Sequence, residues 1–439
     1  MRKIHLALVT TLAVLVSCQT NSSKPSFASQ QVIVSADIAN FWQAYDAIQI
    51  TEDSIQQLAH LHDLFLSKAS VGQQRMMEAR RYTPEEYLRT ITSYPAFWNS
   101  IRSNTEDLEP FNEALRSGVN KLASIYPDIT HSTIYYTVGT HRAPGTGFDG
   151  TVLIGTEYAL GDSTTVTFEL PEHKQNYYKI NPTKYLTFLC VHEYVHTQQL
   201  PMVYDLLSLT LYEGIAEFVA IKATGQNSPW KAFTYGPEHE DRIRQRFEKD
   251  MFRPNTIYNW LWNSPQNEFN TSDLGYFVGH QLAARYYDAA GDKKEAIKQL
   301  IDLDYEQKSN VEGLVNSTRY FSKPLGELYQ DYESKQPTVI GIKQFKNHSQ
   351  EVSPSIDKIT IEFSQPLNGH HTGVDFGELG EDAFPKGTLT GRHWGADNQT
   401  WTIPVELEPN KRYQILISYN FRTDDNVHLK PYLIDFMTK

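Results

Sequence analysis

The sequence is poor in cysteine and in positive charge. Its 439 residues include two cysteines, and 40 lysines and arginines face 52 aspartates and glutamates, for a formal net charge of -12. This charge argues against nucleic acid or an anionic membrane surface as the main partner. With 40% hydrophobic and 21% charged residues, the composition is that of a soluble globular protein, and the length suggests two or three domains.

The apolar run near the N-terminus is too short to span a bilayer as a mature helix. A basic "MRK" precedes residues 4–16, and the run ends in "LVSC", with the small Ser17 before Cys18. This end resembles the lipobox of bacterial lipoproteins, which implies cleavage before Cys18 and acylation of that cysteine. The alternative is an ordinary secretory signal. We expect a signal peptide at 1–18 and a flexible polar tether at 19–34.

Acylation has two consequences for the mature protein. It predicts anchoring to a lipid bilayer in a bacterial cell envelope, at the outer membrane or the cell surface. It also leaves Cys190 without a partner, so we expect no disulfides and a cysteine that packs as a small hydrophobic residue.

After the N-terminal segment, the spacing of apolar residues changes once, from mainly helical to strand-like. From residue 37 to about 126, apolar residues recur at helical spacing, and "STIYYTVG" and "GTVLIGTEYAL" are strand-like around the loop "RAPGTGFDG". From 336, segments such as "KITIEFSQPL" and "RYQILISYNF" alternate, which predicts strands. We expect a mainly α (α+β) domain at 35–335 and an all-β sandwich at 336–439. The second region resembles bacterial Ig-like domains.

A compact motif carries the chemistry. "HEYVH" places His192 and His196 one turn apart on one face of a helix, which we expect to start at Asn181 or Thr183 and to end near Pro201. The surrounding residues are apolar nearly all round, so the helix should be buried. Two buried histidines on one face need hydrogen-bond partners or a metal.

The next predicted helix supplies further candidates. In "LYEGIAEFVA", Glu213 is the favoured third ligand, and Glu217 follows one turn later, as an alternative ligand or as a partner that orients a histidine. Asp205 is a lower-ranked contender from the preceding turn. Two histidines and one glutamate leave the fourth position of a zinc ion open, as in catalytic sites. We expect one Zn²⁺ per chain.

"HEYVH" followed by "YEGIAEF" resembles the gluzincin clan of zinc metallopeptidases. Over most of the first domain, "DIANFWQAYD", "HEYVHTQQ" and "LGYFVGHQLA" also resemble uncharacterised bacterial lipoproteins identified as predicted zinc proteases. The resemblance implies a zincin-like hydrolase domain in which Glu213 completes the metal site. It also implies that Glu193 is the general base acting on water.

Other residues are candidates for contact with substrate. Tyr276 and His280 lie one turn apart in a predicted helix, and either is a candidate donor to the oxyanion. The strand "GTVLIG" is a candidate to pair with an extended peptide. Glu157 is a candidate to recognise an N-terminal amine, the alternative being a surface salt bridge.

These features predict a membrane-anchored, exported zinc peptidase that acts on a peptide or protein. The competing hypothesis is a surface assembly or adhesion lipoprotein that retains a metallopeptidase fold without catalysis. A third possibility is a carbohydrate-binding sandwich that uses Trp394 and Trp401.

Overall fold

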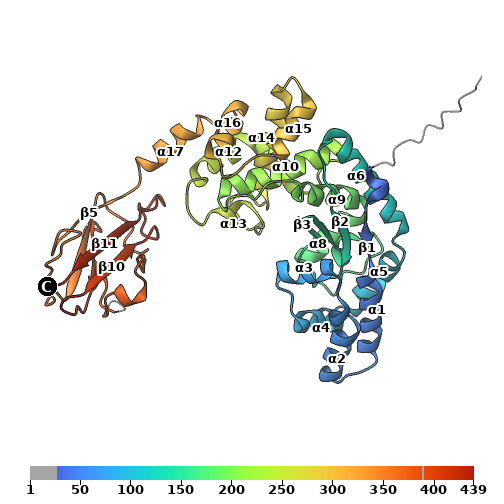
Figure 1. Cartoon of the computed structure of the whole chain (residues 1–439), viewed down its shortest axis with the longest axis horizontal. Coiled ribbons are helices and arrows are strands. Elements are labelled where there is room, and N and C mark those ends of the chain that lie inside the picture. Colours follow the sequence, from blue (N-terminus) through green and yellow to red (C-terminus); the bar gives the residue numbers. More distant parts are fainter. Residues whose placement is uncertain (1–26, 388–389) are drawn as a thin grey trace, which may run out of the picture.

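The computed structural model describes residues 27–387 and 390–439. Cys18 and the predicted signal peptide lie outside this range. The first part is mainly helical and the last part consists of β-sheets, so the chain is multidomain (Figure 1). The helices that open the described chain are α1 (Ala36–Gln49), α2 (Ser54–Leu64), α3 (Val71–Arg80), α4 (Pro84–Ser93), α5 (Pro95–Glu106) and α6 (Glu109–Ile125).

A four-stranded mixed sheet follows them, in the order β1-β2-β4-β3. Its strands are β1 (Ile33–Val34), β2 (Thr133–Thr137), β3 (Gly145–Phe148) and β4 (Thr151–Gly155). β1, β2 and β4 run parallel, and β3 pairs antiparallel with β4 at the edge.

Three expectations about this sheet are wrong. The predicted tether at 19–34 is too long, because β1 pairs with β2 and the Gln31 side chain is buried and donates to the Ser132 carbonyl. The loop "RAPGTGFDG" contains β3. Since β4 is paired on both sides, "GTVLIG" has no free edge for a substrate. The edge strand is β3, and Arg80 donates to its Gly145 carbonyl at 3.1 Å.

Two consecutive helices carry the motif. A 3₁₀ turn, η3 (Pro182–Tyr185), precedes α9 (Leu186–His196), and α10 (Leu206–Thr224) ends at Gly225 in a left-handed conformation, φ 71°. The first helix is shorter than expected. Asn181 has φ 57°, which is not a capping conformation, and the chain turns after His196.

The remaining helices complete the helical part. They are α7 (Thr156–Ala159), α8 (Glu172–Tyr178), α11 (Lys231–Tyr235), α12 (Glu240–Asp250), α13 (Ile257–Trp260), α14 (Leu274–Ala289), α15 (Lys293–Ile301), α16 (Lys308–Thr318) and α17 (Leu325–Glu333), with short 3₁₀ turns between some of them. Within the described residues, none of the helices is both long and apolar enough to cross a membrane.

Glycines let α10 and α14 cross in close contact. A Cβ atom on Gly279 would lie 1.9 Å from the Thr210 carbonyl oxygen, and one on Gly214 would lie 2.3 Å from the Gly279 Cα. No larger residue fits at either position without moving a helix. The crossing therefore brings residue 276, about one turn before Gly279, towards residue 213.

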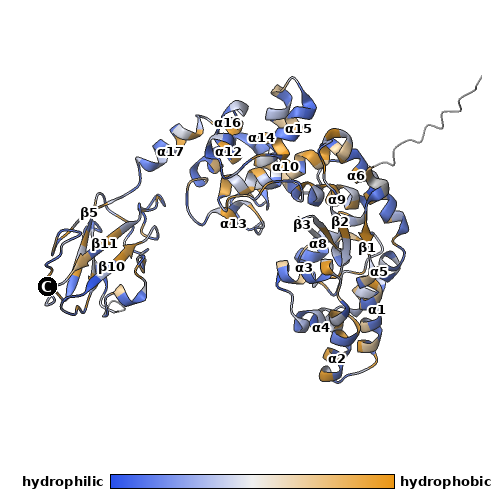
Figure 2. Cartoon of the chain, viewed as in Figure 1, coloured by the Kyte–Doolittle hydropathy of each residue, from blue (hydrophilic) through white to orange (hydrophobic). Residues whose placement is uncertain are grey.

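Two antiparallel sheets make up the C-terminal part. One has the order β5-β6-β9-β8 and the other β11-β10-β7. Their strands are β5 (Val339–Ile342), β6 (Lys358–Phe363), β7 (Val374–Asp375), β8 (His393–Trp394), β9 (Thr400–Pro404), β10 (Arg412–Ile417) and β11 (Tyr432–Met437). Apolar residues on β10 and β11 (Figure 2) join those of β6 and β9 in one core.

This core is separate from that of the helical part, which ends near α17. The predicted boundary at 335/336 falls between the two cores. Trp401 is 1% exposed and belongs to the sandwich core, where Trp394 packs beside it against Phe421. The Trp401 ring is therefore used for packing, whereas Trp394 is only partly buried, and the carbohydrate-binding hypothesis stays a prediction.

Candidate metal centre

Three buried side chains converge between α9 and α10. His192 Nε2 and His196 Nε2 are 3.1 Å apart, and Glu213 Oε2 lies 3.4 Å from the first and 3.2 Å from the second. All three residues are less than 9% exposed. Among the described residues, these three side chains form a group that is able to bind one metal ion. Glu217 and Asp205, the alternative ligands, lie outside this group.

The tautomer of His196 follows from its neighbours. Gln199 donates its Nε2 to the Tyr212 carbonyl oxygen (3.0 Å), which only accepts, so its Oε1 faces His196 Nδ1 at 2.8 Å. Nδ1 therefore carries the proton and donates it to Gln199. The lone pair of His196 is then on Nε2, which faces His192 and Glu213. The Tyr212 ring stacks on the imidazole at 4.4 Å and holds its plane.

Glu217 lies beside the other histidine. Its Oε2 is 2.9 Å from His192 Nδ1, and the carboxylate is fully buried. The two groups are at ion-pair distance, but neither atom makes a hydrogen bond, so the carboxylate favours positive charge on the imidazole without fixing its tautomer. The role of Glu217 in orienting a histidine stays a prediction from the sequence.

The convergence fits a divalent cation. Two imidazole lone pairs and a carboxylate oxygen repel one another at 3.1–3.4 Å unless positive charge lies between them. Zinc with ligands at about 2.0–2.1 Å in a tetrahedron would separate them by about 3.3 Å. The spacing and the chemistry of the donors are compatible with a divalent metal ion.

The surrounding charges also favour a cation here. Burial by itself lowers the pKa of His192, but the carboxylates of Glu213 and Glu217 outweigh burial and raise it well above its ordinary value. Burial likewise acts to raise the pKa of Glu213, and the two imidazoles overcome it and lower that pKa. The site therefore stabilises a negative carboxylate beside positive charge.

Glu193 lies beside the edge strand. A Cβ on Gly145 would be 3.1 Å from its Cγ and Oε1, and one on Gly147 would be 1.9 Å from its carbonyl oxygen. The two glycines of β3 thus allow the strand to run directly against this turn of α9. Burial raises the pKa of Glu193, and the two histidines offset part of that rise. A raised pKa suits a group that takes up a proton.

The two oxyanion candidates differ in their surroundings. The ring of Tyr276 stacks on His192, with centroids 6.2 Å apart and planes at 26°. Burial raises the pKa of Tyr276 well above its ordinary value, so its hydroxyl keeps its proton. His280 instead contacts the rings of Phe218 and Phe233. Burial lowers its pKa to about 4, so it is neutral.

Two other candidates have structural roles. Asp205 is exposed, and its carboxylate caps α10 by accepting bonds from the Ser208 backbone and hydroxyl, both at 2.8 Å. Glu157 is fully buried, which excludes a surface salt bridge, and it accepts the backbone N–H groups of Gly139 and His141. Burial raises its pKa to about 7. It braces the loop that leads into β3.

Sequence reasoning missed three residues at this centre: Gln199, Tyr212 and Trp262. The indole of Trp262 donates to the Tyr276 hydroxyl at 3.0 Å. Gln199 follows His196 by three residues, a spacing that keeps it near the end of α9. No spacing in the sequence relates Trp262 to the motif. Trp262 follows α13, and the fold brings it into contact with Tyr276 on α14.

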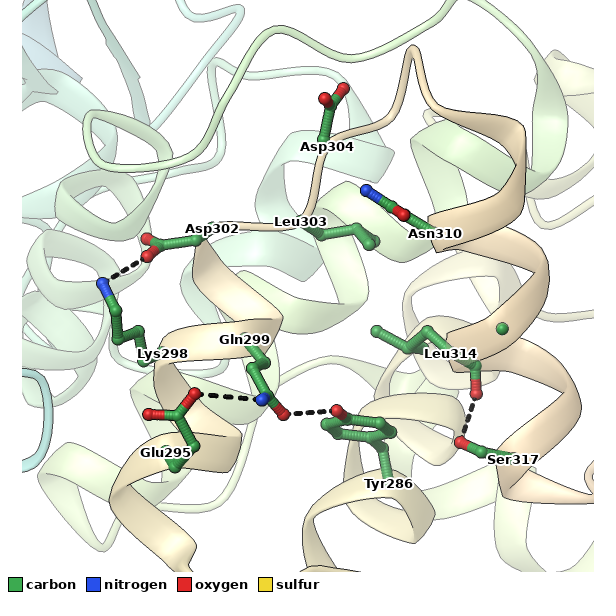
Figure 3. A pocket seen from close by; sticks show the side chains of 11 residues that line it. Tyr286, Glu295, Lys298, Gln299, Asp302, Leu303, Asp304, Asn310, Leu314 and Ser317 are labelled. Carbon is green, nitrogen blue, oxygen red and sulfur yellow. Dashed lines mark hydrogen bonds and ion pairs between the residues drawn. The ribbon is translucent and has the colours of Figure 1, made fainter.

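A cavity of about 490 Å³ lies elsewhere, between α15 and α16 (Figure 3). Its lining includes Tyr286 and Glu295, both bonded to Gln299. It contains none of the candidate metal-site residues. Its polar groups are largely occupied with one another.

Comparisons with known proteins add little. No protein-family model and no curated protein matches the chain. Among solved structures, the chain is similar to an aminopeptidase N family protein from Idiomarina loihiensis, with 12% identity and a TM-score of 0.31 over 76% of this chain. The chain spans 62% of that protein. A similarity of this size does not define a fold, so the argument for function is made from the site.

Proposed function

We propose that the chain is a zinc-dependent peptidase, with His192, His196 and Glu213 as ligands. The observation that carries the proposal is the convergence of two imidazole nitrogens and a carboxylate oxygen within 3.4 Å of one another, with His196 hydrogen-bonded to Gln199 and the Glu217 carboxylate beside His192 Nδ1. Polar groups beside the Nδ1 atoms of histidines are typical of metal ligands.

The neighbouring residues supply the rest of a hydrolytic site. Zinc, when bound, would polarise a peptide carbonyl and increase the acidity of a water molecule. Glu193 takes the proton from the attacking water and passes it to the leaving amine. Tyr276 donates its hydroxyl proton to the oxyanion that develops on the carbonyl. An extended peptide would pair with the edge of β3 that faces away from β4, beside Glu193, and would there meet Arg80, which donates to the Gly145 carbonyl.

The cellular location is proposed from the sequence. "LVSC" with Cys18 supports an acyl anchor, and the mature enzyme would act in the bacterial cell envelope on a peptide or protein substrate. The zincin-like fold of the helical part and the Ig-like character of the sandwich belong to the same proposal.

Two variants separate the metal from the chemistry. Glu193→Gln keeps the three ligands and removes the base, so we expect unchanged zinc content and a loss of at least about 100-fold in kcat on a peptide library. His192→Ala removes a ligand, so we expect zinc to fall from one ion per chain to a trace. Elemental analysis and a cleavage assay on the soluble form measure both.

The outcomes also distinguish the proposed peptidase from a non-catalytic protein with the same fold. Stoichiometric zinc without turnover on a broad library would favour a non-catalytic assembly or adhesion protein. Hydrolysis by Glu193→Gln at the wild-type rate would show that the assigned base is wrong. Unchanged zinc in His192→Ala would remove the metal centre itself.

A further inference from the structure

The backbone of Trp262 is held in an uncommon conformation. Its φ is 53°, in the left-handed region, which costs free energy for a residue with a large side chain. Such conformations persist where the surrounding structure enforces them, and they are concentrated at functional sites. The side chain is also 49% exposed, so burial of the indole does not explain the strain.

Polar contacts around Asp273 enforce this conformation. The backbone amide of Asp273 donates to Asn263 Oδ1 at 2.7 Å. Asn263 in turn donates to the Asn259 carbonyl at 2.7 Å. Asp273 is the residue immediately before α14, the helix that carries Tyr276. The turn at 262–263 is therefore fixed to the start of that helix.

From this turn the side chain of Trp262 reaches Tyr276. Its Nε1 donates to the Tyr276 hydroxyl at 3.0 Å, and the Tyr276 ring stacks on His192. An indole N–H is a donor only, so the tyrosine oxygen must accept from it. The hydroxyl proton of Tyr276 therefore points to another acceptor and is available to an oxyanion.

We propose that Trp262 is a positioning residue, which holds the Tyr276 hydroxyl as a hydrogen-bond donor facing the metal centre. This role rests on the proposed peptidase function. It predicts that Trp262 acts on the transition state only through Tyr276 and has no part in holding the metal.

The test combines two substitutions with a matched control. Trp262→Phe keeps a ring and removes the N–H, so we expect kcat to fall about 3- to 10-fold, with KM within about 2-fold and zinc content unchanged. In a Tyr276→Phe background the same substitution should change kcat by less than about 2-fold, because the partner is already gone. Trp230→Phe, whose ring packs against Tyr177, is the control and should leave kcat unchanged.

A second measurement does not depend on turnover. In zinc-loaded protein with ¹⁵N-labelled tryptophan, the indole N–H resonance of Trp262 should lie downfield of its position in Tyr276→Phe and exchange more slowly with solvent. An unchanged resonance in Tyr276→Phe would overturn the contact. Equal kinetic losses from Trp262→Phe with and without Tyr276 would overturn its action through the tyrosine.

The same design distinguishes the two levels of the proposal. A wild-type protein that binds zinc but cleaves no peptide would overturn the peptidase function and the kinetic role of Trp262 together. A wild-type protein that cleaves peptides, with kcat unchanged in Trp262→Phe, would overturn the positioning role alone.

Discussion

A polar side chain lies beside the Nδ1 atom of each histidine at the candidate metal centre, and for one histidine it fixes the position of the proton. For His196 this residue is Gln199, whose amide is itself oriented by the Tyr212 carbonyl. An unsupported imidazole exchanges its proton between two nitrogens, and the form protonated on Nε2 has no lone pair for a metal. The neutral Gln199 therefore contributes to metal binding without touching the ion.

This dependence predicts a specific loss of affinity. Gln199→Leu removes the acceptor from His196 Nδ1, so we expect zinc affinity to fall about 10- to 100-fold, measured by competition with a chromogenic chelator. The adjacent Gln198→Leu is the matched control, because Gln198 bonds to Thr130 and Thr197. Equal affinities in the two variants would contradict the role assigned to Gln199.

The sequence predicted the residues whose relation is local. His192, Glu193 and His196 share one helical turn, and Glu213 and Glu217 share the next helix, so their spacing and the resemblance to the gluzincin motif brought them into consideration. The role of Trp262 was not predictable from the sequence. It depends on a turn held by Asp273 and on a hydrogen bond to Tyr276, which lies 14 residues later in the chain. Tyr276 and His280 were equal candidates by spacing, and only their neighbours in the fold separate them.

At the scale of elements, the helix crossing at Gly214 and Gly279 sets the position of α14. Gly214 follows the candidate ligand Glu213, and Gly279 follows Tyr276 by about one turn. Because a Cβ at Gly279 would overlap the Thr210 carbonyl, the distance between the two helices is set by the absence of side chains. Any separation of the helices also moves Tyr276 away from the ligands.

We therefore expect Gly279→Ala to be harmful to both stability and activity. Forcing a methyl group into this crossing should lower the free energy of unfolding by about 1–3 kcal/mol, and it should lower kcat by moving Tyr276. Gly313→Ala in α16 is the control, since a Cβ there meets nothing within 4 Å. It should stabilise the chain by about 0.5–1 kcal/mol. Denaturant titration of both variants measures the difference, and a stabilised Gly279→Ala would refute the crossing.

Long, periodic elements were predictable and short edge elements were not. The helices from α1 to α6 and the strand β2 lie where their patterns indicated. "GTVLIGTEYAL" was expected to be a strand throughout, but β4 ends at Gly155 and Thr156–Ala159 form α7. β3 was assigned to a loop, since "GTGF" contains two glycines and has low strand propensity, yet pairing with β4 and contact with α9 make it a strand. β1 is two residues long, and only its partner β2 defines it.

At the scale of the molecule, two cores are joined through few contacts. The helical part and the sandwich have separate sets of buried residues. The bonds between them include Arg253 to the Asp425 carbonyl (3.3 Å) and Asn255 to the Tyr419 hydroxyl (3.4 Å), both exposed. Exposed contacts of this kind contribute little to stability, so the two parts should unfold as separate units.

Calorimetry of the soluble form should then show two transitions, and the metal should act on one of them. Zinc at about 1,000 times its dissociation constant stabilises the part that binds it by about 4 kcal/mol, so the transition of the helical part should rise in temperature. Ile415→Ala removes a fully buried side chain from β10. It should cost about 2–5 kcal/mol and lower only the transition of the sandwich.

His192→Ala provides the control, since it should abolish the response to zinc and leave the transition of the sandwich in place. A single transition that moves as a whole with zinc and with Ile415→Ala would contradict the separation of the two cores. In that case the sandwich would be coupled to the metal centre through contacts such as those of Arg253 and Asn255. Charge and polarity at these two positions would then become determinants of activity, although neither residue is part of the metal centre.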